Sequence, residues 1–424
     1  MVLALVAVAA VSCSPGVAGK GRLDGARIEV LGVWSGAEYD GIAAVLRGFE
    51  RATGATVLYT SAGHGVAAAL DARIAEGSAP DVAFVPQPGL LQRYAADGRL
   101  VALDGVAGDL VRRNYDRVWR DLGSAGGHLY GVWLKAADKS LVWYDVGVFE
   151  RLGAVPPADL DGLARLASAV EAAGLAPFSV AGAAGWALTD WFENLYLRTA
   201  GPDAYDRLTR HELPWTDPSV TRVLGLMAAL LAPGRLAAGV DGSLGTDFPS
   251  SVQRLAAKPP SAAMTVEGDF VAGELRGAGA EVGVDTDAFP FPAAAGSRPA
   301  AAAAVVGAGD AAVLLRPSAA GAAFLRWVAT PEAAALWAAR GGFVSPNRNL
   351  DLAVYPDELS RTFARSVLEA GDSFRFDLSD LAPAAFGGKE GQGMRAALQD
   401  FLRTRDVDAT AARLEAGATA AYNP

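Results

Sequence analysis

Residues 26–59, ARIEVLGVWSGAEYDGIAAVLRGFERATGATVLY, decide the fold. The apolar stretch 26–34 predicts a strand, and 40–53 predicts an amphipathic helix that Gly54 ends. A second strand is predicted over 55–59, a helix over 66–75 and a third strand over 81–85. Short apolar strands that alternate with longer helical patterns are typical of an α/β fold.

The length of the chain predicts two lobes. The chain has 424 residues, and a single hydrophobic core stops growing at about 250–300 residues. In open α/β sheets, ligands bind at loops that follow strand ends. The loops Trp34–Glu38, Ser61–His64 and Pro86–Gly89 are therefore expected to meet at one cleft.

The N-terminus, MVLALVAVAAVSCS, predicts an exported lipoprotein. Its apolar run is too short for a membrane-spanning helix but has the length of a secretory signal. Ser12 precedes Cys13, the single cysteine of the chain. We expect a signal peptide over 1–12, a lipid on Cys13 and a tether over 13–23. The alternative is a buried strand with a chance cysteine.

The amino-acid composition argues against several classes of binding partner and cofactor. Lys and Arg number 37 against 47 Asp and Glu, a formal net charge of −10, which argues against nucleic acid and anionic membrane surfaces. One cysteine excludes a disulfide framework, and the three histidines lack metal-ligand spacing. We therefore expect no cofactor and no metal.

The stretch GWALTDWFEN (185–194) has the residue types that a sugar site needs. Aromatic rings cover the C–H faces of a sugar, while carboxylates and amides pair with its hydroxyls. Trp186, Asp190, Trp191 and Glu193 fall together here. A helix start capped by Thr189 or Asp190 is predicted to place Trp191 and Asp190 at a helix mouth. The alternative is that the tryptophan belongs to the core.

Other polar residues are candidates for the same cleft. Asp138 and Lys139 lie where the chain is expected to cross between lobes, although adjacent opposite charges also suit a solvated face. Gln87 stands between two prolines and suits a hydroxyl or a turn. Asp310 follows GAG in an apolar stretch, so it needs a partner, either a ligand hydroxyl or a helix N-terminus.

Longer motifs carry a family resemblance. They are FERATGATV, APDVAFVPQPGLLQRYAADGRLVALD, HLYGVWLKAADKSLVWYDVGVFERLG, ELPWTDPSV, AAMTVEGDF and TPEAAALWAARGGFVSPNRNL. In this order the chain resembles the extracellular solute-binding proteins (family 1) of bacterial ABC sugar importers, which include maltodextrin-binding protein. GVWSGAEYD, VPQPGLL, KAADKS, TDWFENLYLRTAGP, DAFPFP, GGFVSPN and FRFDLSDLAP resemble its α-glucoside-binding branch.

The resemblance implies a fold. It is the type II periplasmic-binding-protein fold, an α/β fold of two lobes, each an open sheet flanked by helices, with the ligand cleft between them. We expect 24–134 with 303–342 in the N-terminal lobe and 138–298 with 345–424 in the C-terminal lobe. Hinges are expected at 133–138, 290–304 and 341–346.

The resemblance also implies a site. Trp191 and Asp190 match the aromatic platform and its neighbour, Asp138 matches a sugar-binding acid, and Phe270 follows Gly268 as a stacking ring. The C-terminal region offers Phe386 where longer-chain sites have tryptophan, which favours a disaccharide. The expected substrate-binding residues are Trp34, Ser35, Gln87, Asp138, Lys139, Trp186, Asp190, Trp191, Glu193, Gly268, Phe270 and Asp310.

The resemblance implies a non-enzymatic monomer, anchored by lipid at the outer face of the cell membrane. It is expected to deliver an α-glucoside such as maltose, sucrose or trehalose to an ABC permease. Two alternatives remain. A secreted glycan-active enzyme could use Asp190 and Glu193 as its two carboxylates, because residues three apart on a helix are neighbours. A binding protein for a polyol or a metal chelate is the other.

Overall fold

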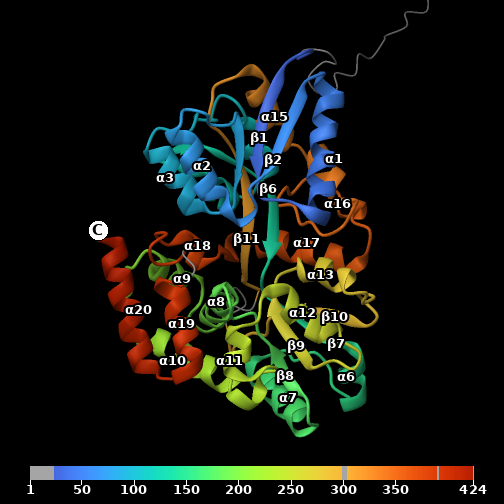
Figure 1. Cartoon of the computed structure of the whole chain (residues 1–424), viewed down its shortest axis with the longest axis vertical. Coiled ribbons are helices and arrows are strands. Elements are labelled where there is room, and N and C mark those ends of the chain that lie inside the picture. The colour runs from blue at the N-terminus through green and yellow to red at the C-terminus, as the bar shows by residue number, and fades with distance from the viewer. Residues whose placement is uncertain (1–22, 298–302, 389–390, 424) are drawn as a thin grey trace, which may run out of the picture.

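The computed structural model describes residues 23–297, 303–388 and 391–423. The predicted signal peptide, Cys13 and most of the tether lie outside these residues, as does part of the expected hinge at 290–304. Two bodies stand one above the other and are joined at a waist (Figure 1). Each is an open sheet flanked by helices, so the predicted α/β fold class is confirmed.

The upper body contains the first sheet. Its strands run in the order β12 (Phe374–Phe376), β11 (Val305–Leu314), β3 (Val82–Val85), β1 (Arg27–Gly32) and β2 (Thr56–Ser61), and β6 (Gly131–Asp138) also pairs with β11. β1 is parallel to β2 and β3. The helices around this sheet are α1 (Gly36–Thr53), α2 (Val66–Ala75), α3 (Pro88–Ala96), α4 (Gly108–Asn114), α5 (Arg117–Leu122), α15 (Ala319–Val328), α16 (Pro331–Ala338) and α17 (Glu358–Ala370).

The opening elements match the prediction closely. The helix predicted over 66–75 has those bounds, and α1 ends before Gly54, whose φ of 80° is left-handed as expected for a helix-ending glycine. The start of α1 was predicted wrongly. It begins at Gly36 rather than at Asp40, because Ser35 is already extended and serves as the N-cap residue.

The lower body contains the second sheet, in the order β10 (Thr286–Pro290), β7 (Leu141–Asp145), β9 (Ala262–Glu267) and β8 (Ala176–Ser179). A short hairpin of β4 (Ser124–Ala125) and β5 (His128–Leu129) stands apart from both sheets. The lower helices are α6 (Val146–Leu152), α7 (Leu160–Ala172), α8 (Trp186–Ala200), α9 (Pro202–Thr209), α10 (Pro218–Leu230), α11 (Gly239–Leu244), α12 (Phe248–Ala256), α13 (Val271–Gly277), α18 (Leu378–Leu381), α19 (Gly393–Thr404) and α20 (Val407–Tyr422).

The chain passes between the two bodies at three places, which we call the crossings: 138–141, 304–307 and 376–379. Two hydrophobic clusters meet here: one fills the upper body and extends to α12 and α13, and we call it the upper core, while the other, the lower core, lies within the lower body apart from the crossings. At the second crossing Val305 packs with the upper core and Val306 with the lower one. At the third, Phe376 belongs to the upper core and Leu378 to the lower one. The long strands β6 and β11 pair with each other on the way to the waist.

The segment after Ser345 lies differently from the prediction. We expected 345–424 in the C-terminal lobe, but Asn347 bridges to Tyr115 beside α4, and β12 joins the upper sheet through β11. The expected hinge at 341–346 is likewise inside the upper core, where Phe343 and Val344 are buried. The pairing of three-residue β12 with β11 is a long-range contact that the local pattern FRF does not reveal.

None of the helices in the described part of the chain has the length and hydropathy of a membrane-spanning helix.

Candidate functional site

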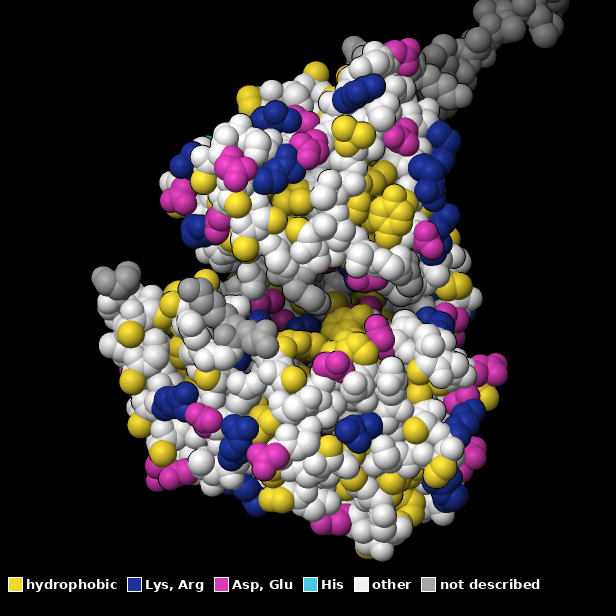
Figure 2. Space-filling model, viewed as in Figure 1, with side chains coloured by type: hydrophobic (Ala, Val, Ile, Leu, Met, Phe, Trp, Pro, Cys, Tyr) yellow, Lys and Arg dark blue, Asp and Glu magenta, His cyan; other side chains and the backbone are white. Residues whose placement is uncertain are grey.

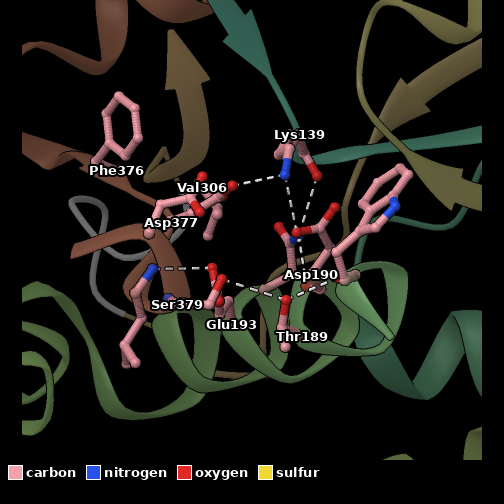
Figure 3. Close-up of polar contacts among 12 residues, drawn as sticks. Lys139, Thr189, Asp190, Glu193, Val306, Phe376, Asp377 and Ser379 are labelled. Atoms are coloured by element: carbon pink, nitrogen blue, oxygen red, sulfur yellow. Dashed lines mark hydrogen bonds and ion pairs between the residues drawn. The ribbon is translucent and has the colours of Figure 1, made fainter. Parts of the chain in front are cut away.

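A buried ion cluster holds the waist together (Figure 3). Lys139, at the first crossing, has its Nζ 3.1 Å from Asp190 Oδ1 and 2.5 Å from Asp377 Oδ2. The two carboxylate side chains are 1% exposed and that of Lys139 is 10% exposed. Asp190 comes from α8 of the lower body and Asp377 from the third crossing, so one ammonium ties two crossings to one helix.

The polar face of α8 extends this ion cluster with further hydrogen bonds to the crossings. Asp190, Glu193 and Asn194 share one face because residues three and four apart on a helix are neighbours. Asn194 Nδ2 donates to the carbonyl of Lys139 (3.0 Å), and its Oδ1 accepts from Ser140 Oγ (2.6 Å). Ser140 Oγ in turn accepts from the backbone N–H of Val306 at the second crossing (2.8 Å).

Glu193 fixes the third crossing. Its carboxylate accepts from the backbone N–H groups of Leu378 and Ser379, each at 3.0 Å, and from the hydroxyl of Tyr205 at 3.3 Å. All three crossings are therefore hydrogen-bonded, directly or through Ser140, to one face of one helix.

Burial sets the protonation of this cluster. Burial raises the pKa of Glu193 to about 8, with the neighbouring Asp190 carboxylate adding to the shift. Burial also raises the pKa values of Asp190 and Asp377, while Lys139 opposes the rise in both. Burial lowers the pKa of Lys139, but the attraction of Asp190 and Asp377 outweighs it, so the pKa lies well above its usual value.

Carboxylate oxygens of Asp190, Glu193 and Asp377 lie within 4.8 Å of one another, a geometry that could hold a metal ion. The ammonium of Lys139 already supplies a positive charge to two of them. We therefore interpret the cluster as a structural ion network.

Aromatic side chains gather between the two bodies. Trp186, at the first residue of α8, lies with its ring centroid 5.5 Å from Phe248 and 6.2 Å from Phe270, and the two phenylalanines are 5.4 Å apart. All three rings are half-buried. Figure 2 shows a hollow at the waist with hydrophobic surface at its floor and acidic and basic side chains around it. Lys139 Nζ lies 5.2 Å from the Trp186 ring centroid, so the ion cluster adjoins this aromatic cluster.

Polar groups of the upper body face the same waist. Lys135 pairs with Glu38 near the start of α1, and Asp310 of β11 lies opposite Lys135 in the β6–β11 pairing. Burial raises the pKa of Asp310 to about 7, although Lys135 lowers it. Gln87 Nε2 donates to Asp380 Oδ1 of α18 at 2.9 Å, a hydrogen bond between the two bodies.

Several predicted site residues lie at or near the waist with part of their surface accessible. Trp186, Phe270, Gln87 and Asp310 are half-buried, and Ser35 is exposed at the start of α1. Gly268 is buried, and a Cβ there would lie 2.3 Å from the Phe270 ring, so the glycine permits the position of that ring. Their roles as ligand contacts stay predictions.

Other predicted residues lie in the interior. Trp191 is 1% exposed and packs edge-on against Phe178 and Phe291, so the expected half-exposed platform at this position is wrong. Trp34 is 1% exposed against Phe84 and Trp337. Asp138 is fully buried, and its Oδ1 accepts from the backbone N–H of Ser140.

The predicted helix start within GWALTDWFEN was also wrong. Gly185, not Thr189 or Asp190, is the N-cap residue of α8, with a left-handed φ of 79°. The helix therefore begins at Trp186, and Trp191, one turn and a half further on, turns toward the lower core. Trp186 has the half-exposed position that we expected of Trp191.

Phe248 and Asp380 lie at the waist but were not among the predicted site residues. Phe248 follows Asp247, which caps α12 by accepting from the N–H of Ser250, and Asp380 lies in LSDLAP. The capping pattern locates the helix start, but only the assembled fold brings Phe248 beside Trp186.

The two joined sheets, the three crossings and the lined hollow define a two-lobe binding protein. Comparison with known proteins agrees. The model of the bacterial extracellular solute-binding protein family matches residues 34–335, and the chain belongs to this family. The chain is 32% identical over 384 residues to the osmoprotective compounds-binding protein GgtB of Synechocystis sp., with 89% of each chain covered.

A second relative and a solved structure extend the comparison. The chain is 32% identical over 381 residues to the alpha-glucosides-binding periplasmic protein AglE of Rhizobium meliloti, with 86% of this chain and 81% of AglE covered. The structure of the bacterial solute receptor AcbH superposes with a TM-score of 0.76 at 22% identity, with 94% of this chain and 100% of AcbH covered. GgtB and AglE are both named as binding proteins, and neither is named as an enzyme.

The ion cluster yields a stability prediction. Lys139→Met leaves Asp190 and Asp377 buried without their cation, which costs about 3–5 kcal/mol. Chemical denaturation measures the loss. Both acids bind protons more readily in the folded variant than in the unfolded chain, so stability falls as pH rises and the deficit is smallest in acid.

The matched control is Lys258→Met in the same body. Lys258 Nζ lies 3.0 Å from Asp285 Oδ1, but the lysine side chain is 71% exposed, so its loss costs about 0–1 kcal/mol. Equal losses of unfolding free energy in the two variants would contradict the stabilising role of the ion cluster.

The two tryptophans of α8 should separate stability from binding. Trp191→Ala removes a core ring and is expected to cost about 3–5 kcal/mol of unfolding free energy. Trp186→Ala removes a half-buried ring and should cost clearly less. Thermal or urea unfolding of both variants checks this, and a larger loss for Trp186→Ala would place that ring in the core instead.

Proposed function

We propose that this protein is the extracytoplasmic substrate-binding component of an ABC importer for a short α-glucoside. The observation that carries the proposal is the half-buried cluster of Trp186, Phe248 and Phe270 between the lobes, with carboxylates and amides close by. Such a floor suits the C–H face of a sugar ring, and its polar border suits the hydroxyls. The name of the relative AglE supports the α-glucoside.

The polar groups that suit a sugar are Asp310, Gln87, Asp380 and Ser35. A carboxylate that accepts from a ligand hydroxyl contributes about 1.5–3 kcal/mol, more than a neutral acceptor. A ligand that touches groups of both lobes binds the closed arrangement better and so shifts the protein toward it. The lobes would then deliver the sugar to the permease as a closed unit.

A second candidate ligand is an osmoprotective compound, because the relative GgtB carries that name at the same identity. A small polyhydroxylated solute would use the same aromatic floor and carboxylate border. The secreted-hydrolase alternative has less support. Asp190 and Glu193 are fully buried, and Glu193 is occupied by two backbone N–H groups and Tyr205.

Calorimetry with maltose, sucrose and trehalose tests the ligand class. Phe270→Ala and Trp186→Ala should each weaken the best sugar by about tenfold, which corresponds to about 1.4 kcal/mol. Arg235→Ala is the control: the half-buried Arg235 side chain pairs with Glu171 of the lower body, outside the aromatic cluster, and the variant should bind as the wild type does. Binding of none of these sugars by the folded wild type would contradict the α-glucoside.

Two further measurements separate the alternatives. A polyol such as sorbitol in the same titration tests the second candidate. Release of monosaccharides from a bound disaccharide would support the enzyme, and its absence over long incubation would support a binding protein.

The anchor is a separate proposal, because it rests on the N-terminal sequence alone: the apolar run, Ser12 before Cys13, and the tether that follows. We expect Cys13→Ser to abolish fatty-acid labelling and to release the protein from membranes or leave it as a precursor. Cell fractionation with labelled palmitate measures both. A variant that still labels and sediments with membranes would overturn the anchor and leave the sugar site untouched.

A further inference from the structure

One side of the interlobe hollow is closed by α3 of the upper body and α18 of the lower body. Figure 1 shows α18 directly below α3, away from α13 and α17. Gln87, the N-cap residue of α3, donates from Nε2 to Asp380 Oδ1 at 2.9 Å. We call this contact, made by Gln87, Gly89 and 380–382, the end wall.

Gly89 shows how tight the end wall is. A Cβ at this position would lie 3.3 Å from the carbonyl oxygen of Asp380, 3.5 Å from that of Leu381 and 3.7 Å from that of Ala382. The first turn of α3 therefore touches the carbonyl end of α18 with no side chain between them. The N-terminal end of α3 carries partial positive charge and faces these carbonyl oxygens, which favours the contact.

The end wall joins two separate cores. Leu90 and Leu91 of α3 pack in the upper core, while Leu378 and Ala382 pack in the lower one. It also stands next to the ion cluster, since Asp380 is close enough to Asp190 to raise the pKa of that carboxyl. The Trp186 ring lies 5.2 Å from Lys139 Nζ in the same cluster. The closed side of the hollow is thus near the aromatic floor.

The aromatic floor is compact. The three ring centroids of Trp186, Phe248 and Phe270 form a triangle with sides of 5.4–6.2 Å. A saccharide of several units needs rings in succession along its length, whereas a triangle of this size makes one platform. Phe386, the aromatic residue of 383–388, is 1% exposed against Trp215 and adds nothing to the floor.

We propose that the end wall limits the ligand to a saccharide of one or two rings, bound by its terminal ring against Gln87 and Asp380. A chain that extends on that side is excluded because a further ring meets the α3–α18 contact, and a chain that extends the other way finds no second platform beyond the triangle of three rings. This inference rests on the proposed sugar-binding function and names the size class of its substrate.

Calorimetry with two matched ligand pairs tests the size limit: maltose against maltotetraose, and sucrose against raffinose. For the sugar series that binds, the wild type should hold the disaccharide at least about tenfold more tightly than the longer homologue. Gly89→Leu wedges the wall apart, and the double variant Gln87→Ala/Asp380→Ala removes its hydrogen bond. Both should shrink the affinity ratio at least about threefold, whatever happens to the affinities themselves.

Arg276→Ala is the control for the ratio. Arg276 of α13 pairs with Asp357 beside α17, at 3.2 Å and on the other side of the molecule, so its loss should leave the ratio unchanged. Circular dichroism confirms that each variant is folded. Leu at position 89 is compatible with the backbone, because Gly89 lies inside α3 and has no left-handed φ.

The outcomes are distinguishable. Disaccharide and longer homologue bound equally by the wild type would overturn the end wall and leave the proposed function standing. A wild-type ratio that survives in both folded wall variants would also overturn it, since the contact would not be the cause. No saccharide binding at all would contradict the proposed function and this inference with it.

Discussion

The two lobes depend on one buried cation. Lys139 is held between Asp190 and Asp377 at the point where the chain leaves the upper sheet, and all three side chains are removed from water. A buried ion pair gains little net stability over an apolar packing of the same shape, because desolvation of the charges offsets their attraction. Its effect is to fix the relative position of the crossings. An arrangement that separates Lys139 from Asp190 or Asp377 leaves a buried carboxylate without its cation, which is strongly unfavourable.

Helix α8 connects the joint between the lobes to the aromatic floor. Its first residue, Trp186, belongs to the aromatic floor, and its face of Asp190, Glu193 and Asn194 holds the crossings. One ring of the aromatic floor and the side chains that hold the joint between the lobes thus belong to one helix. A ligand can bias the relative position of the lobes only by contacting them differently in two arrangements. Contacts made at Trp186 reach the joint through a single helix.

The sequence predicted the parts of this arrangement that have a local signal. The helix over 66–75 and the glycine end of α1 follow from periodicity and from a left-handed residue. The sequence also indicated the residue types of the waist, since GWALTDWFEN contains both an aromatic ring of the floor and the two acids that α8 contributes to the ion cluster and the third crossing. Their assignment was not visible. With the N-cap of α8 at Gly185 rather than Thr189, Trp191 lies in the lower core and Trp186 at the waist. The spacing of the acids, in turn, does not distinguish one that binds a sugar from one that pairs with Lys139.

Long-range pairing accounts for the remaining errors. β12 is three residues long, and its place in the upper sheet is fixed by β11, which lies far from it in sequence. That pairing carries Asp377 back to the joint, where its N–H donates to the carbonyl of Gly307 and its carboxylate meets Lys139. The third crossing therefore lies at 376–379 rather than at 341–346. Because α18 begins within this crossing, at Leu378, the same pairing sets Asp380 opposite Gln87. The position of the end wall is thus a consequence of how the C-terminal segment returns to the upper sheet, and a substitution that displaced β12 would move both the joint and the wall.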